Sequence, residues 1–248
     1  MDNNSKIGIV TGCGKGIGRA IIEELSIKPE WQLVGIYKSQ VEDECQLRHS
    51  VGSRLRLIKG DVTSSMIWDE AIDAAVDTFG NSPTHYIANA GMRCREKLED
   101  VSSDRLDQLW KTNYFALREM ICALTRRNLI ETANVVYISS IVGQLGFKDL
   151  DDYGATKAAC DSLIRSMASR HSRARFNSIA PGFTKSSYAK AFEENQKELH
   201  AWTLNRARMR RWGECQEIAQ TVEFLCSDSS SFMTGQVLNV DGGWTTNA

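Results

Sequence analysis

Prolines are scarce in this sequence, and no proline-, glycine- or serine-rich linker divides it. Only three prolines occur among the 248 residues, so we expect residues 1–248 to fold as a single domain. No uninterrupted apolar run approaches the roughly 20 residues that span a membrane, and the polar start Met1–Lys6 lacks the apolar core of a signal peptide. These absences predict a cytoplasmic protein without a membrane partner.

An excess of charge of either sign is also missing. The formal net charge is -1, so electrostatics give no reason to expect nucleic acid or an anionic membrane surface as a partner. The seven cysteines are scattered, odd in number and without a C-x-x-C pair, which indicates reduced thiols rather than disulfides. The four histidines are equally dispersed, and we expect no metal site.

Short apolar runs alternate with amphipathic helical patterns along the chain. The predicted strands are 6–11, 32–37, 54–60, 85–89, 134–139, 175–179 and 235–243. The predicted helices are 19–25, 68–79, 106–124, 151–168 and 214–226. This rhythm predicts an α/β fold, a Rossmann-like doubly wound parallel sheet of about seven strands with helices on both faces and ligands at the carboxyl ends of the strands.

The first predicted strand is followed by a glycine-rich loop and then by a helix. Glycines at such a loop permit positive backbone angles and let a pyrophosphate approach the N–H groups at the helix N-terminus. The pattern therefore predicts a dinucleotide site. The expected contacts in the loop are Gly12, Gly14, Lys15, Gly16, Ile17 and Gly18.

The acid that would take both ribose hydroxyls of NAD is missing after the second strand. Tyr37 and Lys38 stand there instead, and Lys15 lies in the glycine loop. Two ammonium groups converging on this point would suit a 2'-phosphate, so we expect NADP(H) to be preferred, with NAD(H) as the alternative. The competing interpretation is that both lysines are merely solvated.

The stretch from Ser139 to Lys157 holds a hydroxyl, a phenol and an ammonium at spacings that suit proton transfer. Tyr153 and Lys157 are four residues apart, so they share one face of a helix that begins near Asp151. The ammonium would lower the pKa of the phenol and make Tyr153 a usable general acid/base, while Ser140 would donate a hydrogen bond to a substrate oxygen. The aspartates before Tyr153 would oppose its ionisation if they faced it. Such a Tyr-x-x-x-Lys pair also occurs by chance, so its support must come from the rest of the chain.

Together these features resemble the short-chain dehydrogenase/reductase family over essentially the whole chain. The glycine loop resembles the family's cofactor loop, and Val240-Asp241-Gly242-Gly243 resembles its C-terminal signature. The resemblance implies further contacts to the cofactor beyond the loop. These are Asp61 and Val62 near the adenine, Asn89-Ala90-Gly91 after the fourth strand, and Pro181, Gly182, Thr184 and Ser186 near the nicotinamide, with the choice between the last two hydroxyls open.

The resemblance also implies a catalytic tetrad of Asn113, Ser140, Tyr153 and Lys157. Tyr153 would donate or accept the proton, Ser140 would orient the carbonyl, Lys157 would also bind the nicotinamide ribose, and Asn113 would hold a water in a proton relay. The implied activity is NADP-dependent hydride transfer between a carbonyl and a secondary alcohol. Within the family, the sequence most resembles 3-oxoacyl-(acyl-carrier-protein) reductases. A catalytically idle dinucleotide-binding sensor or scaffold is the alternative.

Residues 183–211 form a long polar, helical-looking segment beside the predicted site. The segment has few apolar anchors in sequence, so we expect a mobile substrate lid, with a surface helical hairpin as the alternative. Its basic residues, including Arg208 and Arg210, would meet a charged substrate, which is a small carbonyl or alcohol, free or carrier-bound. We also expect a homotetramer or homodimer built on the helices after Ser102 and Asp151. Apolar candidates for that interface are Leu109, Phe115, Leu163 and Met167, of which some must instead face the sheet.

Overall fold

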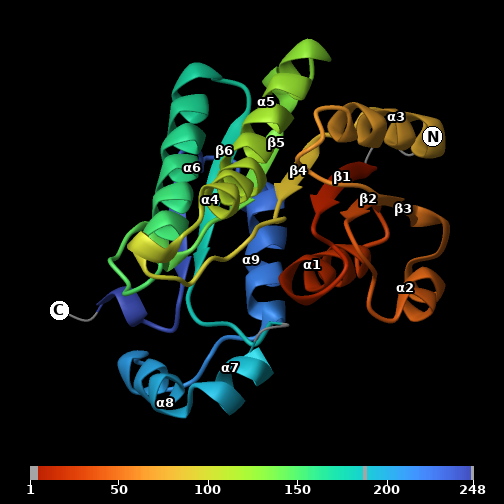
Figure 1. Ribbon diagram of the computed structural model, residues 1–248. Helices are drawn as coiled ribbons and strands as arrows, with labels where there is room; N and C mark the ends of the chain where they lie inside the picture. The colour runs from red at the N-terminus through yellow and green to blue at the C-terminus, as the bar shows by residue number, and fades with distance from the viewer. Residues whose placement is uncertain (1–4, 187–188, 247–248) are drawn as a thin grey trace.

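A computed structural model describes residues 5–186 and 189–246 (Figure 1). Seven strands form one sheet in the order β3-β2-β1-β4-β5-β6-β7, and every neighbouring pair is parallel. The strands are β1 Lys6–Thr11, β2 Trp31–Tyr37, β3 Leu55–Lys59, β4 His85–Ala88, β5 Asn134–Ile138, β6 Arg175–Pro181 and β7 Val237–Val240. The predicted doubly wound parallel sheet is confirmed.

Helices cover both faces of this sheet. They are α1 Gly16–Ser26, α2 Glu44–Val51, α3 Ile67–Phe79, α4 Ser103–Trp110, α5 Ala116–Arg126, α6 Asp151–Arg170, α7 Ala189–Asn195, α8 Lys197–Arg206 and α9 Cys215–Cys226. Apolar residues of α1, α2 and α9 pack on one face, and those of α3, α5 and α6 pack on the other. In β1, Ile9 joins the α3 side and the next residue, Val10, joins the α1 side, because successive strand residues point to opposite faces. No apolar pattern in the sequence indicated α2.

A π-helical turn at Lys111–Phe115 joins α4 to α5. The prediction of one regular helix over 106–124 is wrong at this turn. A widened turn rotates the following side chains relative to those of a regular helix, and such turns are frequent at functional sites. Here the turn contains Asn113, which is buried.

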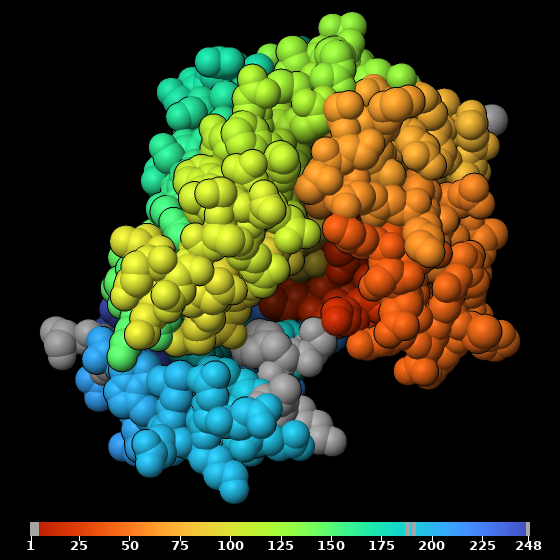
Figure 2. Space-filling view, viewed as in Figure 1, coloured from red at the N-terminus to blue at the C-terminus, as the bar shows by residue number. Residues whose placement is uncertain are grey.

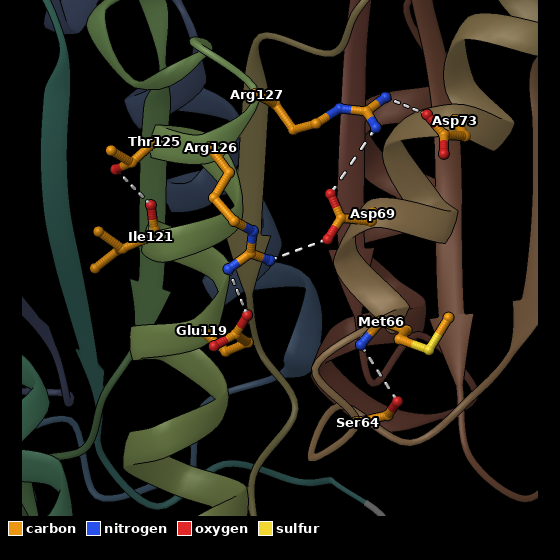
Figure 3. A network of polar contacts seen from close by, with 9 residues as sticks. All are labelled: Ser64, Met66, Asp69, Asp73, Glu119, Ile121, Thr125, Arg126 and Arg127. Atoms are coloured by element: carbon orange, nitrogen blue, oxygen red, sulfur yellow. Dashed lines mark hydrogen bonds and ion pairs between the residues drawn. The ribbon is translucent and has the colours of Figure 1, made fainter.

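Ion pairs tie α5 to α3 on the face that α6 shares (Figure 3). Arg126 lies 2.9 Å from Glu119 of its own helix and 3.0 Å from Asp69 of α3, while Arg127 pairs with Asp73. Single exposed ion pairs contribute at most about 1 kcal/mol, but this group shares partners as a network. The network fixes the C-terminal end of α5, the helix that begins directly after the π-helical turn.

Helices α7 and α8 follow β6 and lie apart from the two helical layers, at the edge of the sheet where its strands end (Figure 1). They form most of the segment predicted as a lid, of which residues 187 and 188 lie outside the described residues. None of the described helices combines the length and the hydropathy that crossing a membrane requires.

Candidate active site

The glycine loop after β1 is shaped by close backbone approaches. Gly12 has a φ of 66°, and a Cβ on it would lie 2.9 Å from the Cα of Ala90. A Cβ on Gly18 would collide with the Gly12 carbonyl oxygen. Only glycine fits these positions, and the loop leads directly into α1 at Gly16. The first N–H groups of α1 are therefore presented to an anion at the helix N-terminus.

Asn89 fastens the end of β4 to this loop. Its Nδ2 donates to the Thr11 carbonyl oxygen at 2.9 Å and to the Gly12 carbonyl oxygen at 3.2 Å. The Thr11 hydroxyl in turn accepts from the backbone N–H groups of Asn89 and Ala90, each at 3.0 Å. Two segments far apart in the sequence thus form one rigid floor.

Two adjoining cavities lie at the carboxyl edge of the sheet. Figure 2 shows a hollow between the N-terminal third of the chain and the α4–α5 segment, and residues of both parts line the first cavity. The first, called the glycine-loop cavity, has a volume of about 360 Å³. It is lined by Gly12, Gly14, Lys15, Gly16, Ile17, Gly18, Tyr37, Lys38, Asp61, Val62, Asn89, Ala90 and Gly91 of the expected residues, and by Ser39, Gln40, Gly60 and Thr112, which sequence reasoning missed.

The second, called the tyrosine cavity, has a volume of about 240 Å³. Its lining includes Ser140, Tyr153, Lys157, Pro181, Gly182, Thr184 and Ser186 of the expected residues. It shares Ile17, Asn89, Gly91 and Ser186 with the glycine-loop cavity, so one elongated ligand can occupy both. The glycine floor and the start of α1 fit the pyrophosphate of a dinucleotide.

Lys38 and Asp61 form an ion pair on the wall of the glycine-loop cavity, with 2.7 Å between Nζ and Oδ2. Burial raises the pKa of Asp61, but the Lys38 ammonium and the hydrogen bonds from Thr63 more than offset it, so the pKa lies below its ordinary value. Asp61 is thus charged at neutral pH, and it holds the Lys38 ammonium beside the cavity. Lys38 nevertheless keeps 66% of its side chain exposed, and Lys15 is exposed at the cavity rim, so solvation of these lysines remains the alternative to a phosphate contact.

The Ser140 hydroxyl meets the Tyr153 phenol because the turn after β5 packs directly on α6. A Cβ on Gly154 would lie 2.9 Å from the Val142 carbonyl oxygen, which shows how closely the two segments approach. Ser140 Oγ accepts from the Val142 N–H at 3.2 Å, and its hydroxyl lies near enough to the Tyr153 phenol to lower the pKa of that phenol. Lys157, one helical turn beyond Tyr153, donates from Nζ to the Ile138 carbonyl oxygen at 2.8 Å.

The predicted direction of the Tyr153 pKa is wrong for the chain by itself. Burial raises this pKa, and the Ser140 hydroxyl and the Arg93 charge only partly offset the effect. Lys157 does not reverse it, because its Nζ is directed to the Ile138 carbonyl oxygen and lies 5.7 Å from the centre of the Tyr153 ring. The phenol is therefore protonated at neutral pH.

Asn113 uses its carboxamide to position two neighbouring segments. Its Oδ1 accepts from the Met92 N–H at 2.8 Å, and its Nδ2 donates to the Met92 carbonyl oxygen at 2.9 Å and to Thr156 Oγ1 at 3.0 Å. Both N–H groups of the amide are thus engaged within the protein. The Asn113 carbonyl oxygen also accepts from Cys160 Sγ at 3.2 Å. A water bound at Asn113, as predicted, would have to share either the side-chain Oδ1 or the backbone carbonyl oxygen with these donors.

The remaining wall of the tyrosine cavity comes from residues that no motif indicated. They are Met92, Arg93, Ile141, Val142, Leu150 and Phe183. Most flank a motif residue in sequence, and that adjacency was the available signal. The two hydroxyls between which the sequence could not choose, those of Thr184 and Ser186, lie in different environments. Thr184 Oγ1 donates to the Gly182 carbonyl oxygen at 3.1 Å, whereas Ser186 lines both cavities.

Aromatic side chains anchor the segment that follows β6. Phe192 and Trp212 are buried, and Trp212 Nε1 donates to Thr203 Oγ1 at 2.8 Å. Phe183 lies 5.3 Å from the Trp212 ring and 6.1 Å from the Phe192 ring, between centroids. The expectation that residues 183–211 have few apolar anchors is therefore wrong. Among the described residues, no three His, Cys, Asp or Glu side chains gather as metal ligands.

Comparison with known proteins agrees with this geometry. The family model described as enoyl-(acyl carrier protein) reductase matches residues 12–245. The chain is 31% identical over 250 residues to a tropinone reductase homologue of Arabidopsis thaliana, covering 98% of this chain and 93% of that protein. It is 29% identical over 250 residues to a 3-oxoacyl-(acyl-carrier-protein) reductase of Vibrio harveyi, covering 98% of each.

The solved structure of ElxO with NADP bound superposes with a TM-score of 0.87 at 24% identity, covering 98% of this chain and 100% of that one. At this identity the likeness shows the fold alone. The fold and the family match together define a Rossmann-fold oxidoreductase that uses a nicotinamide dinucleotide. The chain belongs to the short-chain dehydrogenase/reductase family, which acts on CH–OH and C=O groups.

Proposed function

We propose that residues 1–248 form one catalytic domain that interconverts a carbonyl and a secondary alcohol with NADP(H). The observation that carries this proposal is the meeting of the Ser140 hydroxyl and the Tyr153 phenol on the wall of the tyrosine cavity, next to the glycine-loop cavity. The substrate is a small carbonyl or alcohol, free or carrier-bound. The active form is a homotetramer or homodimer.

Bound NADPH supplies the hydride, and the protein supplies the proton and the alignment. Ser140 donates a hydrogen bond to the carbonyl oxygen, and Tyr153 gives its proton to the same oxygen as the alcohol forms. A phenol with a raised pKa is protonated at neutral pH, which is the form that reduction requires. Lys157 would stabilise the phenolate by its charge and would hold the nicotinamide ribose when the cofactor is bound, while Asn113 positions Gly91 and Met92 beside it.

The preference for NADP(H) follows from charge at the adenine end. Lys38 is held beside the glycine-loop cavity by Asp61, and Lys15 lies on the same cavity. A 2'-phosphate placed between these ammonium groups gains charge-assisted hydrogen bonds that the 2'-hydroxyl of NAD cannot match. Asp61 opposes this gain in part, because it already neutralises some of the Lys38 charge.

The test is NADPH consumption, followed by absorbance, with a panel of keto-sugars, keto-acyl thioesters and cyclic ketones. Tyr153→Phe should abolish turnover and leave NADPH affinity nearly unchanged, because it removes the transferable proton but no group that holds the nucleotide. If the phenylalanine variant keeps most of the wild-type rate, Tyr153 is not the acid. NADPH binding without turnover of any ketone would instead support an idle sensor or scaffold.

A further inference from the structure

A third cavity, with a volume of about 440 Å³, adjoins the tyrosine cavity at Phe183. We call it the aromatic cavity. It lies between the loop 145–148, the helix α8 and Trp244 near the end of the described chain. Because Phe183 lines both cavities, a substrate whose carbonyl reaches Ser140 and Tyr153 can extend past this ring.

Four of the ten residues that line the aromatic cavity are aromatic, and their rings contact one another. Trp244 stacks on Phe147 with 5.9 Å between centroids, and it meets Trp202 edge-on at 5.3 Å. Phe183 lies 5.0 Å from Trp244. Trp202 nevertheless keeps 48% of its surface exposed, so its ring is available to an apolar group of a ligand. An apolar body of aromatic or acyl type would therefore gain contact area here.

The charged residues on this cavity are all cations. Arg95, Lys148 and Arg206 line it, and no Asp or Glu does so among the described residues. The Arg206 guanidinium lies 5.9 Å from the centre of the Trp244 ring, at the aromatic wall itself. Arg95 donates to the Lys148 carbonyl oxygen at 3.2 Å and thereby joins two loops of the rim. Clustered cations beside a low-dielectric aromatic wall attract an anion.

We propose that the aromatic cavity is the distal substrate subsite and that the substrate is an amphipathic anion, a ketone whose apolar body ends in a carboxylate. The body lies against Trp202 and Trp244, and the carboxylate meets Arg206. This inference rests on the proposed reductase activity, because the reacting carbonyl must lie at Ser140 and Tyr153.

The structure also revises which basic residues meet a charged substrate. Arg208 and Arg210 were the expected contacts, but neither lines the aromatic cavity. The side chain of Arg208 lies against Gly243, where an added Cβ would be 2.9 Å from its own Cβ. Arg210 is exposed and has a φ of 51°. Arg206 is the member of this basic segment that reaches the cavity.

The first experiment compares two aryl ketones with the same apolar body, one ending in a carboxylate and the other in its methyl ester. We expect wild-type kcat/KM to favour the carboxylate by about tenfold or more, as for a charge-assisted contact. Arg206→Met should remove most of this preference and leave the ester unchanged, and Arg206→Lys should restore part of it. Arg210→Asn removes the same charge from the same segment but should keep the full preference, because Arg210 does not line the cavity. Asparagine tolerates the positive φ at this position, so the fold should be kept.

The second experiment measures binding without turnover. Quenching of tryptophan fluorescence by 4-phenylbutyrate should saturate in the wild type at about tenfold lower concentration than in Arg206→Met, and 4-phenylbutyramide should bind both equally weakly. Equal kcat/KM for carboxylate and ester, or equal losses for both in Arg206→Met, would overturn the subsite while leaving the reductase standing. Binding of 4-phenylbutyrate at Arg206 with no ketone reduced would keep the anion site and refute the proposed activity.

Discussion

Lys157 places an amino group in the wall of the tyrosine cavity, almost completely shielded from solvent. It is 4% exposed, and burial lowers its pKa from 10.5 to about 8 even though the nearby Cys160 and Asp161 raise it. Asp161 is buried as well, and its Oδ2 accepts from Ser139 Oγ at 2.8 Å. Burial raises the pKa of Asp161, against the Ser139 and Ser178 hydroxyls and the Lys157 charge. The two groups therefore sustain each other's charge within the protein.

The depressed pKa of Lys157 makes a prediction about stability. Below pH 8 the ammonium is charged in both states, so the cost of burying it is fully present. Between pH 8 and 10.5 the folded protein releases the proton first, the unfolded chain holds more protons, and the free energy of unfolding rises with pH. Relative to Lys157→Met, which lacks this titration, the free energy of unfolding of the wild type should rise by up to about 3 kcal/mol between pH 8 and 10.5.

Urea unfolding of both proteins at intervals from pH 7 to 10.5 measures this difference. Titrations of other cysteines and tyrosines largely cancel, because both proteins contain them. A difference between the two proteins that stays constant with pH would mean that the Lys157 charge is not destabilised by burial.

Lys38 is the residue on which the cofactor preference depends. Lys38→Ala should weaken NADPH binding by about tenfold or more and leave NADH binding nearly unchanged, because only the 2'-phosphate gains a charge-assisted contact from this ammonium. Lys59→Ala is the matched control, since Lys59 is exposed at the end of β3, where it pairs with Tyr37, but does not line the glycine-loop cavity. Fluorescence titration with both cofactors measures the change, and equal losses for NADPH and NADH would assign Lys38 a structural role.

At the scale of elements, a small aromatic cluster and an ion pair hold the segment 183–212. Phe183, Phe192 and Trp212 pack together, and the Arg211–Glu217 ion pair fixes the end of the segment at the start of α9. The Arg211 guanidinium, with help from the Glu214 N–H, lowers the pKa of Glu217 to about 2. This ion pair is therefore complete above about pH 4.5 and is lost as the pH falls toward 2.

Trp212→Ala should loosen α7 and α8 without unfolding the sheet. Removing a buried tryptophan costs about 3 to 5 kcal/mol, and here the loss falls on a segment with little other packing. Hydrogen exchange should therefore become faster in peptides covering 189–206, while β5 stays protected. Trp202→Ala is the control, because Trp202 is half-exposed and should leave α7 unchanged. Equal acceleration in β5 would show that the cluster supports the whole fold rather than the lid.

The pattern of apolar runs was sufficient to place the sheet, since buried parallel strands leave a continuous apolar signature. For the first strand it gave both ends, Lys6 and Thr11. It could not reveal α2, because a short polar helix shows little periodicity. The π-helical turn was missed because one widened turn hardly changes the apolar pattern. The lid anchors were missed because Phe183, Phe192 and Trp212 are distant in sequence and meet only in the folded chain.

For the candidate site too, the sequence predicted some features and could not predict others. Spacing and family motifs identified the groups that line the two cavities, because those groups are fixed by the chemistry of a dinucleotide and a carbonyl. The direction of the Tyr153 pKa depends on burial, and the pairing of Lys38 with Asp61 depends on how two strands are placed side by side. Neither quantity is encoded in a local pattern.

At the scale of the whole molecule, an aromatic patch on the outer side of the α4–α5 segment has no described partner. Trp110, Tyr114 and Phe115 form a chain of edge-on ring contacts at 5.8 and 5.4 Å, and Phe115 is 51% exposed. Of the four interface candidates, Leu109 and Met167 are buried, as expected for those that face inward. Leu163 is partly buried against the core, so Phe115 is the predicted contact that stays outward.

We predict that the wild type is a homotetramer or homodimer and that Phe115→Asp shifts it toward the monomer. A second copy placed on this patch by closed symmetry would cover the Phe115 ring, and a carboxylate buried there without a partner would oppose association. Met66→Asp introduces the same charge at a residue that is 75% exposed on another surface, so it should leave the assembly intact. Light scattering at micromolar concentration measures the mass, and the melting temperature checks that both variants fold. A monomeric wild type, or equal dissociation by both substitutions, would remove the α4–α5 patch as the interface.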